Sequence, residues 1–264
     1  MYGRYAPITS SLRLHLALLR RDGEPARATP PTGRVVVLAP HMDDEVFGCG
    51  GTIALAADAG ARVTFVYVTG ASKSAASDAA SAGPDVALAS ERKDETRRAA
   101  AVLGVTDLVF LDQSNGVLAV TDAAVAALAD ALARRSPSAV FLPFLTDQDR
   151  DHWITNCLFV EAAARARVAP SVACWGYEVG TPLVANAVVD ITAAADRKRL
   201  AMQEFTSERS ELDYPRAMLG LNAYRSLHRG RAQGLAEAFH VADLGVYRRL
   251  FQMVARGMGG RAAA

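Results

Sequence analysis

RVVVLAPHMDDEVFGCGGTIALAADAG, residues 34–60, is the stretch that decides the fold class of this chain. Its first part, Arg34–Ala39, is a short β-branched apolar run, typical of a strand buried on both faces of a parallel sheet. Its last part, residues 50–59, is a run of small residues with helical character, and Gly60 is a normal helix stop. Strand, polar connection and helix in this order predict the first part of a βαβ unit.

The same alternation continues along the chain. Further strands are expected at residues 63–68, 107–111 and 139–143, and helices at residues 85–103, from a Thr121 cap to Arg135, and from about 152 to 168. This rhythm predicts right-handed βαβ connections and an α/β fold with a Rossmann-like, doubly wound, mostly parallel sheet. Beyond residue 170 we expect extra strands at 172–179 and 187–191, a helix at 194–205 and a basic helical tail.

The domain organisation follows from this pattern. Residues 1–33 are predicted to be an N-terminal extension, with a short amphipathic helix at about 11–21 and a Pro-, Gly- and Ala-rich linker after it. Residues 34–264 are expected to form a single domain. Its C-terminal part, residues 205–264, is predicted to be helical and to form the substrate pocket together with the Ser-, Ala- and Gly-rich loop at 71–86.

Composition and charge restrict the class of protein. With 29 Lys and Arg against 28 Asp and Glu, and no long basic block, the chain gives no electrostatic case for nucleic acid as its main partner. No apolar run approaches the ~18 residues of a membrane span, and the N-terminus lacks the pattern of a signal peptide. The three cysteines are scattered without CxxC spacing, which favours a reducing, cytoplasmic location. The sequence does not fix the oligomeric state and is compatible with a homo-oligomer.

Two polar clusters follow the first and fourth predicted strands. His41-Met42-Asp43-Asp44-Glu45 leaves the first strand, and Asp147-Gln148-Asp149-Arg150-Asp151-His152 leaves the fourth. In a doubly wound sheet with the usual 3-2-1-4 order these strands are neighbours, and ligands bind at their carboxyl ends, where the winding direction reverses. We therefore expect the two clusters to lie close together, although they are far apart in the sequence.

The residue types in these clusters suit a divalent metal ion. Two imidazoles and one carboxylate, from His41, Asp44 and His152, match the ligand preferences of zinc and leave a position open for water. Asp43, beside them, is the candidate base that takes a proton from that water. Asp151 is expected to orient a ligand imidazole. The sequence thus predicts a metal site that activates water for hydrolysis, with zinc as the first choice and another divalent metal as the alternative.

A different interpretation starts from Gly48-Cys49-Gly50-Gly51, which has the composition of a phosphate-binding loop after the first strand. A dinucleotide fingerprint places its glycines directly after the strand, whereas here the run from His41 to Glu45 intervenes. The second strand also ends without an acidic residue for a ribose. A non-hydrolytic nucleotide-binding module is therefore a remote alternative, and we interpret the glycines as close packing of loop and helix against the sheet.

At these residues the sequence resembles the PIG-L/LmbE-like family of zinc-dependent N-deacetylases. Ala39–Gly51 is similar to the family's His-Pro-Asp-Asp-Glu run with its Gly-rich helix start, and Asp151-His152 is similar to the Asp-His pair that opens a later helix. Weaker similarities are found at Arg92 and Glu95, Tyr177–Val179, Asp190–Thr192 with Lys198, and Ala236–Phe239. The resemblance covers roughly residues 34–240.

Carried over position by position, the resemblance implies a role for each residue of the first motif and the Asp-His pair. His41, Asp44 and His152 would bind zinc, and Asp43 would be the general base that acts on the zinc-bound water. Arg92 would hold substrate hydroxyls or a phosphate.

The sequence departs from the family pattern at two positions. Met42 replaces the usual proline, which removes no ligand. Asp149 stands where many members have a histidine thought to help stabilise the oxyanion, and an ionised carboxylate cannot do this. Zinc itself or another donor must then help, with His228 and His240 as candidates. Asp149 is expected to bind a substrate amine or hydroxyl, or to orient His152.

The resemblance implies a hydrolase that removes the N-acetyl group from a small-molecule substrate, an N-acetylglucosamine-like amino sugar. The sugar is expected within a glycoside, a lipid-linked sugar, an aminoglycoside-type or glycopeptide antibiotic intermediate, or a low-molecular-weight thiol. An amidase that cleaves a larger acyl group or a thiol conjugate is the alternative. Its metal site would look identical, so only the pocket behind the metal distinguishes the two.

Overall fold

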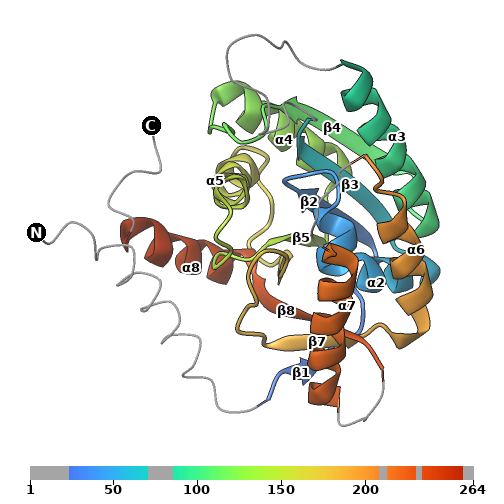
Figure 1. Ribbon diagram of the computed structural model, residues 1–264. Helices are drawn as coiled ribbons and strands as arrows, with labels where there is room; N and C mark the ends of the chain where they lie inside the picture. The colour runs from blue at the N-terminus through green and yellow to red at the C-terminus, as the bar shows by residue number, and fades with distance from the viewer. Residues whose placement is uncertain (1–23, 71–85, 208–212, 230–233, 258–264) are drawn as a thin grey trace, which may run out of the picture.

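The computed structural model describes residues 24–70, 86–207, 213–229 and 234–257. They form an 8-stranded sheet in the order β1-β7-β8-β6-β5-β2-β3-β4, with helices on both faces (Figure 1). The strands are β1 (Ala26–Arg27), β2 (Arg34–Ala39), β3 (Arg62–Thr69), β4 (Asp107–Gln113), β5 (Ala139–Pro143), β6 (Ala173–Tyr177), β7 (Ala187–Asp190) and β8 (Ala236–Asp243). The helix predicted at 11–21 and residues 71–85 of the predicted loop lie outside the described residues.

Strand β2 lies at the centre of the parallel half of the sheet. It pairs in parallel with β3 on one side and with β5 on the other, so that Val37 lies opposite both Phe65 and Phe141. Strand β4 follows β3, and the order β4-β3-β2-β5 is the one expected from the sequence. The predicted α/β doubly wound fold is therefore confirmed. It places the carboxyl ends of β2 and β5 next to each other, where ligands bind in such sheets.

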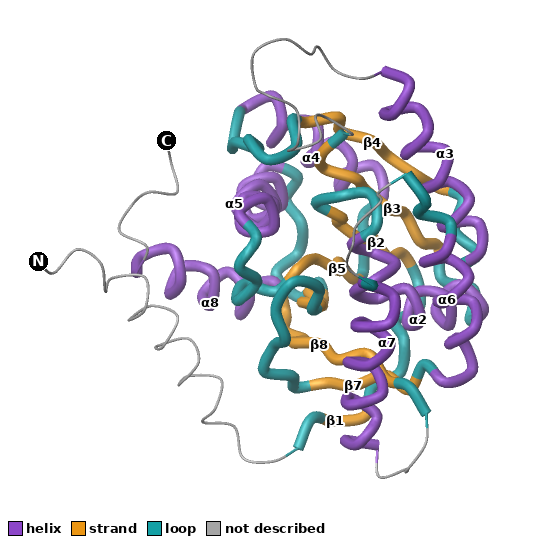
Figure 2. Tube along the Cα trace, viewed as in Figure 1, coloured by secondary structure: helices purple, strands orange, loops and turns teal. Residues whose placement is uncertain are grey.

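Alternate side chains of β2 point to opposite faces of the sheet and enter two hydrophobic cores. Val35 and Val37 pack in the core covered by α2, α3 and α6, whereas Val36 and Leu38 pack in the core covered by α4 and α5 (Figure 2). The helices are α2 (Asp44–Asp58), α3 (Val86–Val102), α4 (Asp122–Arg135), α5 (Arg150–Arg165), α6 (Ala195–Gln203), α7 (Tyr214–Arg225) and α8 (Leu244–Gly257), with the 3-10 helices η1 (Thr192–Ala194) and η2 (Ser226–Arg229). Burial on both faces explains why the five residues of β2 that follow Arg34 are all apolar.

Strand β8 shows that the prediction of a wholly helical C-terminal part is wrong. It lies between β6 and β7 and pairs antiparallel with both. Its residues Glu237 and His240 are buried, so the polar side chains that hide the strand pattern in the sequence are inside the fold. Strand β1, within the predicted linker, pairs in parallel with β7 at the edge of the sheet.

Helix α2 begins at Asp44, whereas the sequence pattern indicates a start at Gly50. Asp44 and Glu45 therefore lie in the first turn of a helix and not in a loop. Acidic side chains are favourable there because the helix dipole places partial positive charge at its N-terminus. A prediction based on the spacing of apolar residues cannot detect this stabilisation of acidic residues, and so it places the start of α2 too late.

Helix α5 begins at Arg150, two residues before the predicted start. Its N-cap residue is Asp149, whose side chain accepts hydrogen bonds from the backbone N–H groups of Asp151 and His152. The cap fixes the direction in which the first turn presents the His152 ring. At α4 the prediction is confirmed, because the Thr121 side chain accepts a hydrogen bond from the third residue of the helix.

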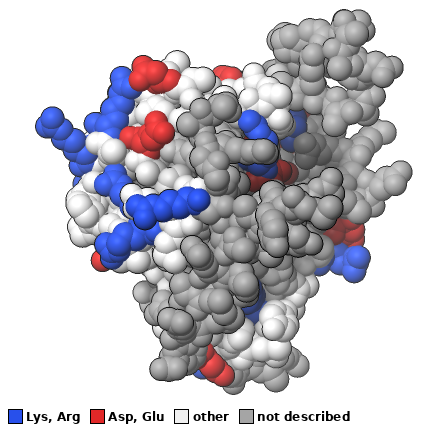
Figure 3. Space-filling model, turned by 90° about the vertical axis from the view of Figure 1, so that its left-hand side faces the viewer, with Lys and Arg blue, Asp and Glu red and all other residues white. Residues whose placement is uncertain are grey.

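The surface of the described residues carries charges of both signs. On the face shown in Figure 3, Lys and Arg side chains gather on one side of the view and have acidic side chains beside them. None of the described helices is both long enough and apolar enough to cross a membrane. The cysteines Cys49, Cys157 and Cys174 are free and buried, as their spacing predicts.

Candidate metal centre

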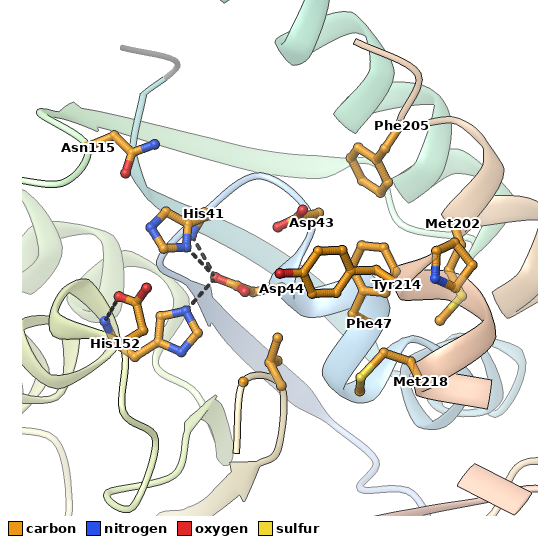
Figure 4. Close-up of a pocket in the computed structure, with 14 residues that line it drawn as sticks. His41, Asp43, Asp44, Phe47, Asn115, His152, Met202, Phe205, Tyr214 and Met218 are labelled. Carbon is orange, nitrogen blue, oxygen red and sulfur yellow. Dashed lines mark hydrogen bonds and ion pairs between the residues drawn. The ribbon is translucent and has the colours of Figure 1, made fainter. Parts of the chain in front are cut away.

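Three side chains from the two predicted clusters meet at one carboxylate oxygen. Oδ2 of Asp44 lies 3.3 Å from Nδ1 of His41 and 3.3 Å from Nε2 of His152. The same oxygen accepts a 2.8 Å hydrogen bond from the backbone N–H of His41. The two imidazole rings are tilted, with centroids 5.3 Å apart (Figure 4). The structure thus brings together the three residues predicted to be metal ligands.

Each imidazole has a second carboxylate near its other nitrogen. Nε2 of His41 lies 3.7 Å from Oδ2 of Asp151. Nδ1 of His152 lies 3.3 Å from Oδ2 of Asp147, at ion-pair distance but outside hydrogen-bond geometry. Both acids also accept backbone hydrogen bonds, of 2.7 Å and 3.1 Å respectively. Asp151 therefore faces a ligand imidazole as expected, and Asp147 has the same relationship to the other one.

The carboxylates make this point attractive to positive charge. Burial by itself lowers the pKa values of His41 and His152, but Asp44 and the outer acids outweigh burial and raise them to about 11 and about 10. Burial also favours the neutral form of Asp44, yet the two imidazoles lower its pKa. The carboxylates thus favour a positive charge on both imidazole rings. A divalent cation bound by neutral imidazoles supplies the same charge, so this donor set fits zinc.

Asp149 lies at the same point and adds a further donor. One ligand atom from each of His41, Asp149 and His152 lies within 4.8 Å of the other two. Asp149 is exposed and lines the pocket beside the cluster. Asp149, one of the two positions at which the sequence departs from the family pattern, therefore faces the site and can contact a substrate there.

Asp43 and Glu45, on either side of Asp44, have different surroundings. Asp43 is the N-cap residue of α2, makes no capping hydrogen bond through its side chain, and lines the pocket (Figure 4). Glu45 is completely buried, accepts a 2.7 Å hydrogen bond from the Tyr67 hydroxyl, and has a pKa that burial raises. Of these two residues, Asp43 is the one that lines the pocket and can exchange a proton with a molecule there, which is what a general base requires.

The cluster forms the polar side of a pocket of about 370 Å³. The polar side chains are those of His41, Asp43, Asp44, Asn115, Asp149 and His152. Across Asp43 lies a group of apolar side chains, here called the apolar wall, which consists of Phe47, Met202, Phe205, Tyr214 and Met218 (Figure 4). None of the described lining residues is Lys or Arg. The pocket therefore combines a metal-binding side with an apolar side.

Three residues with predicted roles toward the substrate are not among the described lining residues. Arg92 is half-buried on α3, and its contact with substrate stays a prediction. His240, in β8, stacks on Phe144 with ring centroids 4.8 Å apart. His228, in η2, lies edge-on to Tyr224 with centroids 6.3 Å apart. The structure brings neither histidine into the described lining.

Sequence reasoning missed Asp147, Asn115 and the apolar wall. Asn115 follows β4, so the rule that ligand-binding residues gather after strand ends also points to it. Asp147 belongs to a predicted cluster, but only the conformation of the loop shows which ring it faces. Tyr214 and Met218 give no signal, because their helical spacing is equally typical of core packing.

Gly48 and Gly51 are packed against neighbouring side chains. A Cβ atom at Gly48 would lie 2.4 Å from Cδ2 of Tyr177, and one at Gly51 would lie 2.7 Å from Cδ1 of Ile191. The space beside these glycines is therefore filled by side chains of the fold. This confirms the packing interpretation and argues against a phosphate-binding loop.

Comparisons with known sequences agree with this geometry. The sequence model of the PIG-L family, described as GlcNAc-PI de-N-acetylase, matches residues 36–163. Diacetylchitobiose deacetylase of Thermococcus kodakarensis is 30% identical over 110 residues. That match covers 42% of this chain and 40% of the relative, so it spans less than half of either protein.

Solved structures share the fold. The conserved protein TT1542 from Thermus thermophilus has a TM-score of 0.64 and 26% identity, over 78% of this chain and 93% of that one. N,N'-diacetylchitobiose deacetylase from Pyrococcus horikoshii has a TM-score of 0.67 and 20% identity, over 94% and 96% of the two chains. The family match at residues 36–163 includes all three predicted metal ligands and Asp43. Residues 36–163 of this chain therefore match the PIG-L family, as the sequence motifs predict.

Proposed function

We propose that this protein is a zinc-dependent hydrolase that removes the N-acetyl group from an N-acetylglucosamine-like amino sugar. The observation that carries the proposal is the meeting of the His41 and His152 imidazoles at one oxygen of Asp44, with Asp43 beside them in the pocket. The match of residues 36–163 to the PIG-L family and the similarity to two diacetylchitobiose deacetylases support it.

His41, Asp44 and His152 would hold the metal ion through two imidazole nitrogens and one carboxylate oxygen. When bound there, zinc supplies a Lewis acid for the amide carbonyl and lowers the pKa of a water molecule. Asp147 and Asp151 keep the two rings oriented from the side that faces away from the cluster.

Asp43 is the proposed general base. Its carboxylate takes a proton from the attacking water and returns it to the leaving nitrogen, so that the amide C–N bond breaks and acetate and a free amino sugar form. Asp149 is proposed to bind a hydroxyl or amine of the sugar. Asn115, whose side-chain amide lies on the same side of the pocket, is a better placed donor for the developing oxyanion than His228 or His240.

A second candidate is an amidase that removes an acyl group larger than acetyl. The metal cluster and the role of Asp43 would be unchanged. The observation that favours this candidate is the apolar wall, because an acetyl group alone is too small to use it. The two candidate functions therefore differ only in the size of the acyl group that is removed. Measuring hydrolysis of substrates with acyl chains of different lengths distinguishes them.

The test combines hydrolysis of N-acetylglucosaminyl compounds, measured as released acetate, with the metal content of the purified protein. We expect Asp43→Asn to retain the metal but to lose activity roughly 100- to 10,000-fold. His152→Ala should lose both metal and activity. Asp58→Asn, at the far end of α2, removes only an exposed ion pair and is the matched control that should retain both. Full activity in Asp43→Asn, or after complete removal of the metal by a chelator, would contradict the proposal.

A further inference from the structure

We propose that the apolar wall binds an uncharged apolar group of the substrate, attached to the amino sugar within a few bonds of the scissile amide. This group is either the acyl chain itself or an apolar aglycone of the sugar, and the two sources share the same alkyl or aromatic chemistry. The inference rests on the proposed amide hydrolysis and specifies the class of amino sugar that the pocket accepts.

The apolar wall is a continuous aromatic and thioether surface. The Phe47 ring has its centroid 6.3 Å from that of Phe205 and 6.4 Å from that of Tyr214. Met202 and Met218 are almost completely buried and line the same side of the pocket (Figure 4). Tyr214 also lines the pocket and is 51% exposed, so that part of its large aromatic ring is in contact with solvent. Covering such surface with an apolar group is favourable because it removes the surface from water.

The charges in the described lining disfavour an anionic ligand at the apolar wall. Asp43, Asp44 and Asp149 all line the pocket, and none of the described lining residues is Lys or Arg. A phosphate or sulfate at the apolar wall would lie close to these carboxylates, with no described Lys or Arg side chain in the lining to pair with it. An uncharged lipid-like, alkyl or aryl substituent therefore suits the wall better.

The distance along α2 fixes where the group must be attached. The backbone N–H of Phe47 donates a 3.0 Å hydrogen bond to the carbonyl of Asp43, so the two residues are one helical turn apart. One turn is about 5.4 Å of helix. The apolar wall thus begins one turn from the proposed base, and a substituent reaches it only if it is close to the reacting amide.

The part of the wall that Phe205 forms is held in place by hydrogen bonds within the fold. Phe205 is followed directly by Thr206 and Ser207, whose backbone and hydroxyl groups donate hydrogen bonds of 2.6–2.9 Å to the Glu95 carboxylate on α3. These contacts fix the end of the segment that carries Phe205. A preformed apolar surface binds its ligand without the entropic cost of ordering it.

The experiment compares two pairs of substrates by kcat/KM. One pair is the methyl and hexyl β-glycosides of N-acetylglucosamine, and the other is the N-acetyl and N-hexanoyl forms of methyl β-glucosaminide. Since each buried CH₂ group strengthens binding roughly fourfold, we expect the longer member of at least one pair to be preferred by about tenfold or more. The pair that shows the preference identifies the source of the apolar group. Equal kcat/KM within both pairs would overturn the inference.

Two variants of the wall and one control locate the effect. Tyr214→Ala and Phe205→Ala should reduce the preference for the longer member toward unity. Tyr224→Ala removes another exposed tyrosine of α7, 57% exposed and outside the described lining, and should leave the preference unchanged. A preference that persists in both wall variants would mean that the apolar group binds elsewhere, and would refute the proposal.

A binding measurement separates this inference from the proposed function. Titration calorimetry of the wild-type protein with hexyl and methyl β-glucoside needs no hydrolysis. If no amide is cleaved, the proposed function fails, but tighter binding of the hexyl compound that is lost in Tyr214→Ala would still support the apolar site. If amides are cleaved, the hexyl and methyl compounds bind equally and neither substrate pair shows a preference, the proposed function stands and the inference is wrong.

Discussion

Nζ of Lys198 lies 2.5 Å from Oε1 of Glu237, and both side chains are completely buried. Glu237 also accepts hydrogen bonds from the backbone N–H groups of Gly51 and Thr52, while Lys198 donates one to the carbonyl of Phe47. An ion pair from α6 and β8 therefore satisfies three backbone groups of α2. This helix carries Asp44 in its first turn, so the ion pair holds the scaffold of the metal centre.

Lys198→Met is expected to lower the free energy of unfolding by about 3–5 kcal/mol, because it leaves the Glu237 charge buried without a partner. Arg197→Met, at the neighbouring position of α6, removes an exposed ion pair with Asp58 and should cost less than about 1 kcal/mol. Urea unfolding of the two variants gives the comparison. An equal decrease in the free energy of unfolding in both variants would show that the buried ion pair stabilises the fold no more than the surface ion pair.

Gly51→Ala should destabilise the fold by about 1–3 kcal/mol through overpacking. The added Cβ would lie 2.8 Å from Cβ of Ile191, an atom too close to its backbone to move aside. Gly220→Ala, within α7, meets no atom within 4 Å and should stabilise the protein by about 0.5–1 kcal/mol, because alanine loses less backbone entropy in a helix. Thermal unfolding of both variants tests the contrast, and a stabilised Gly51→Ala protein would disprove the tight packing.

Asp147→Asn should weaken metal binding roughly 10- to 100-fold, because the His152 ring loses the carboxylate that orients it. The readout is the zinc affinity measured by competition with a chelator of known affinity. Asp122→Asn, which removes an exposed partner of Arg165, is the control with the same change of charge. Identical affinities for the two variants would show that Asp147 does not position the ligand.

Glu95→Gln should reveal a pH-dependent contribution to stability. Burial acts to raise the pKa of Glu95, but the hydrogen bonds from Ser207 and Thr206 outweigh burial and lower it. A carboxyl group with a lowered pKa stabilises the folded state above its unfolded pKa, and this contribution disappears as the pH falls through the folded pKa. The difference in unfolding free energy between wild type and variant should therefore be largest near neutral pH and shrink below about pH 4. Urea titrations at both pH values measure it, and a constant difference would argue against an ionised Glu95.

The meeting of His41 and His152 was predictable because it follows from topology. Apolar runs at residues 34–39 and 139–143 indicate two buried parallel strands, and the usual order of such strands makes them neighbours. Residues that leave their carboxyl ends must then approach each other, whatever the sequence between them. The residue types alone indicate a cation.

The other parts of the site depend on contacts that no local pattern encodes. Which acid faces which imidazole is decided by the loop before α5, where Asp147 and Asp151 are four residues apart and contact different rings. Strand β8 was hidden because its Glu237 is neutralised by Lys198, a residue from another element. The apolar wall forms only when α7 packs over α2, and its residues look like ordinary helix-packing side chains until that arrangement is known.

The parts of the pocket differ in where they lie relative to the family match. The matched segment, residues 36–163, contains the three proposed metal ligands and the proposed base, whereas four of the five apolar-wall residues, from Met202 to Met218, come after it. The residues proposed for the reaction and most of those proposed for substrate preference therefore lie in separate segments of the chain. Grafting residues 202–218 from a relative is expected to transfer that relative's substrate preference while the hydrolytic machinery stays as it is.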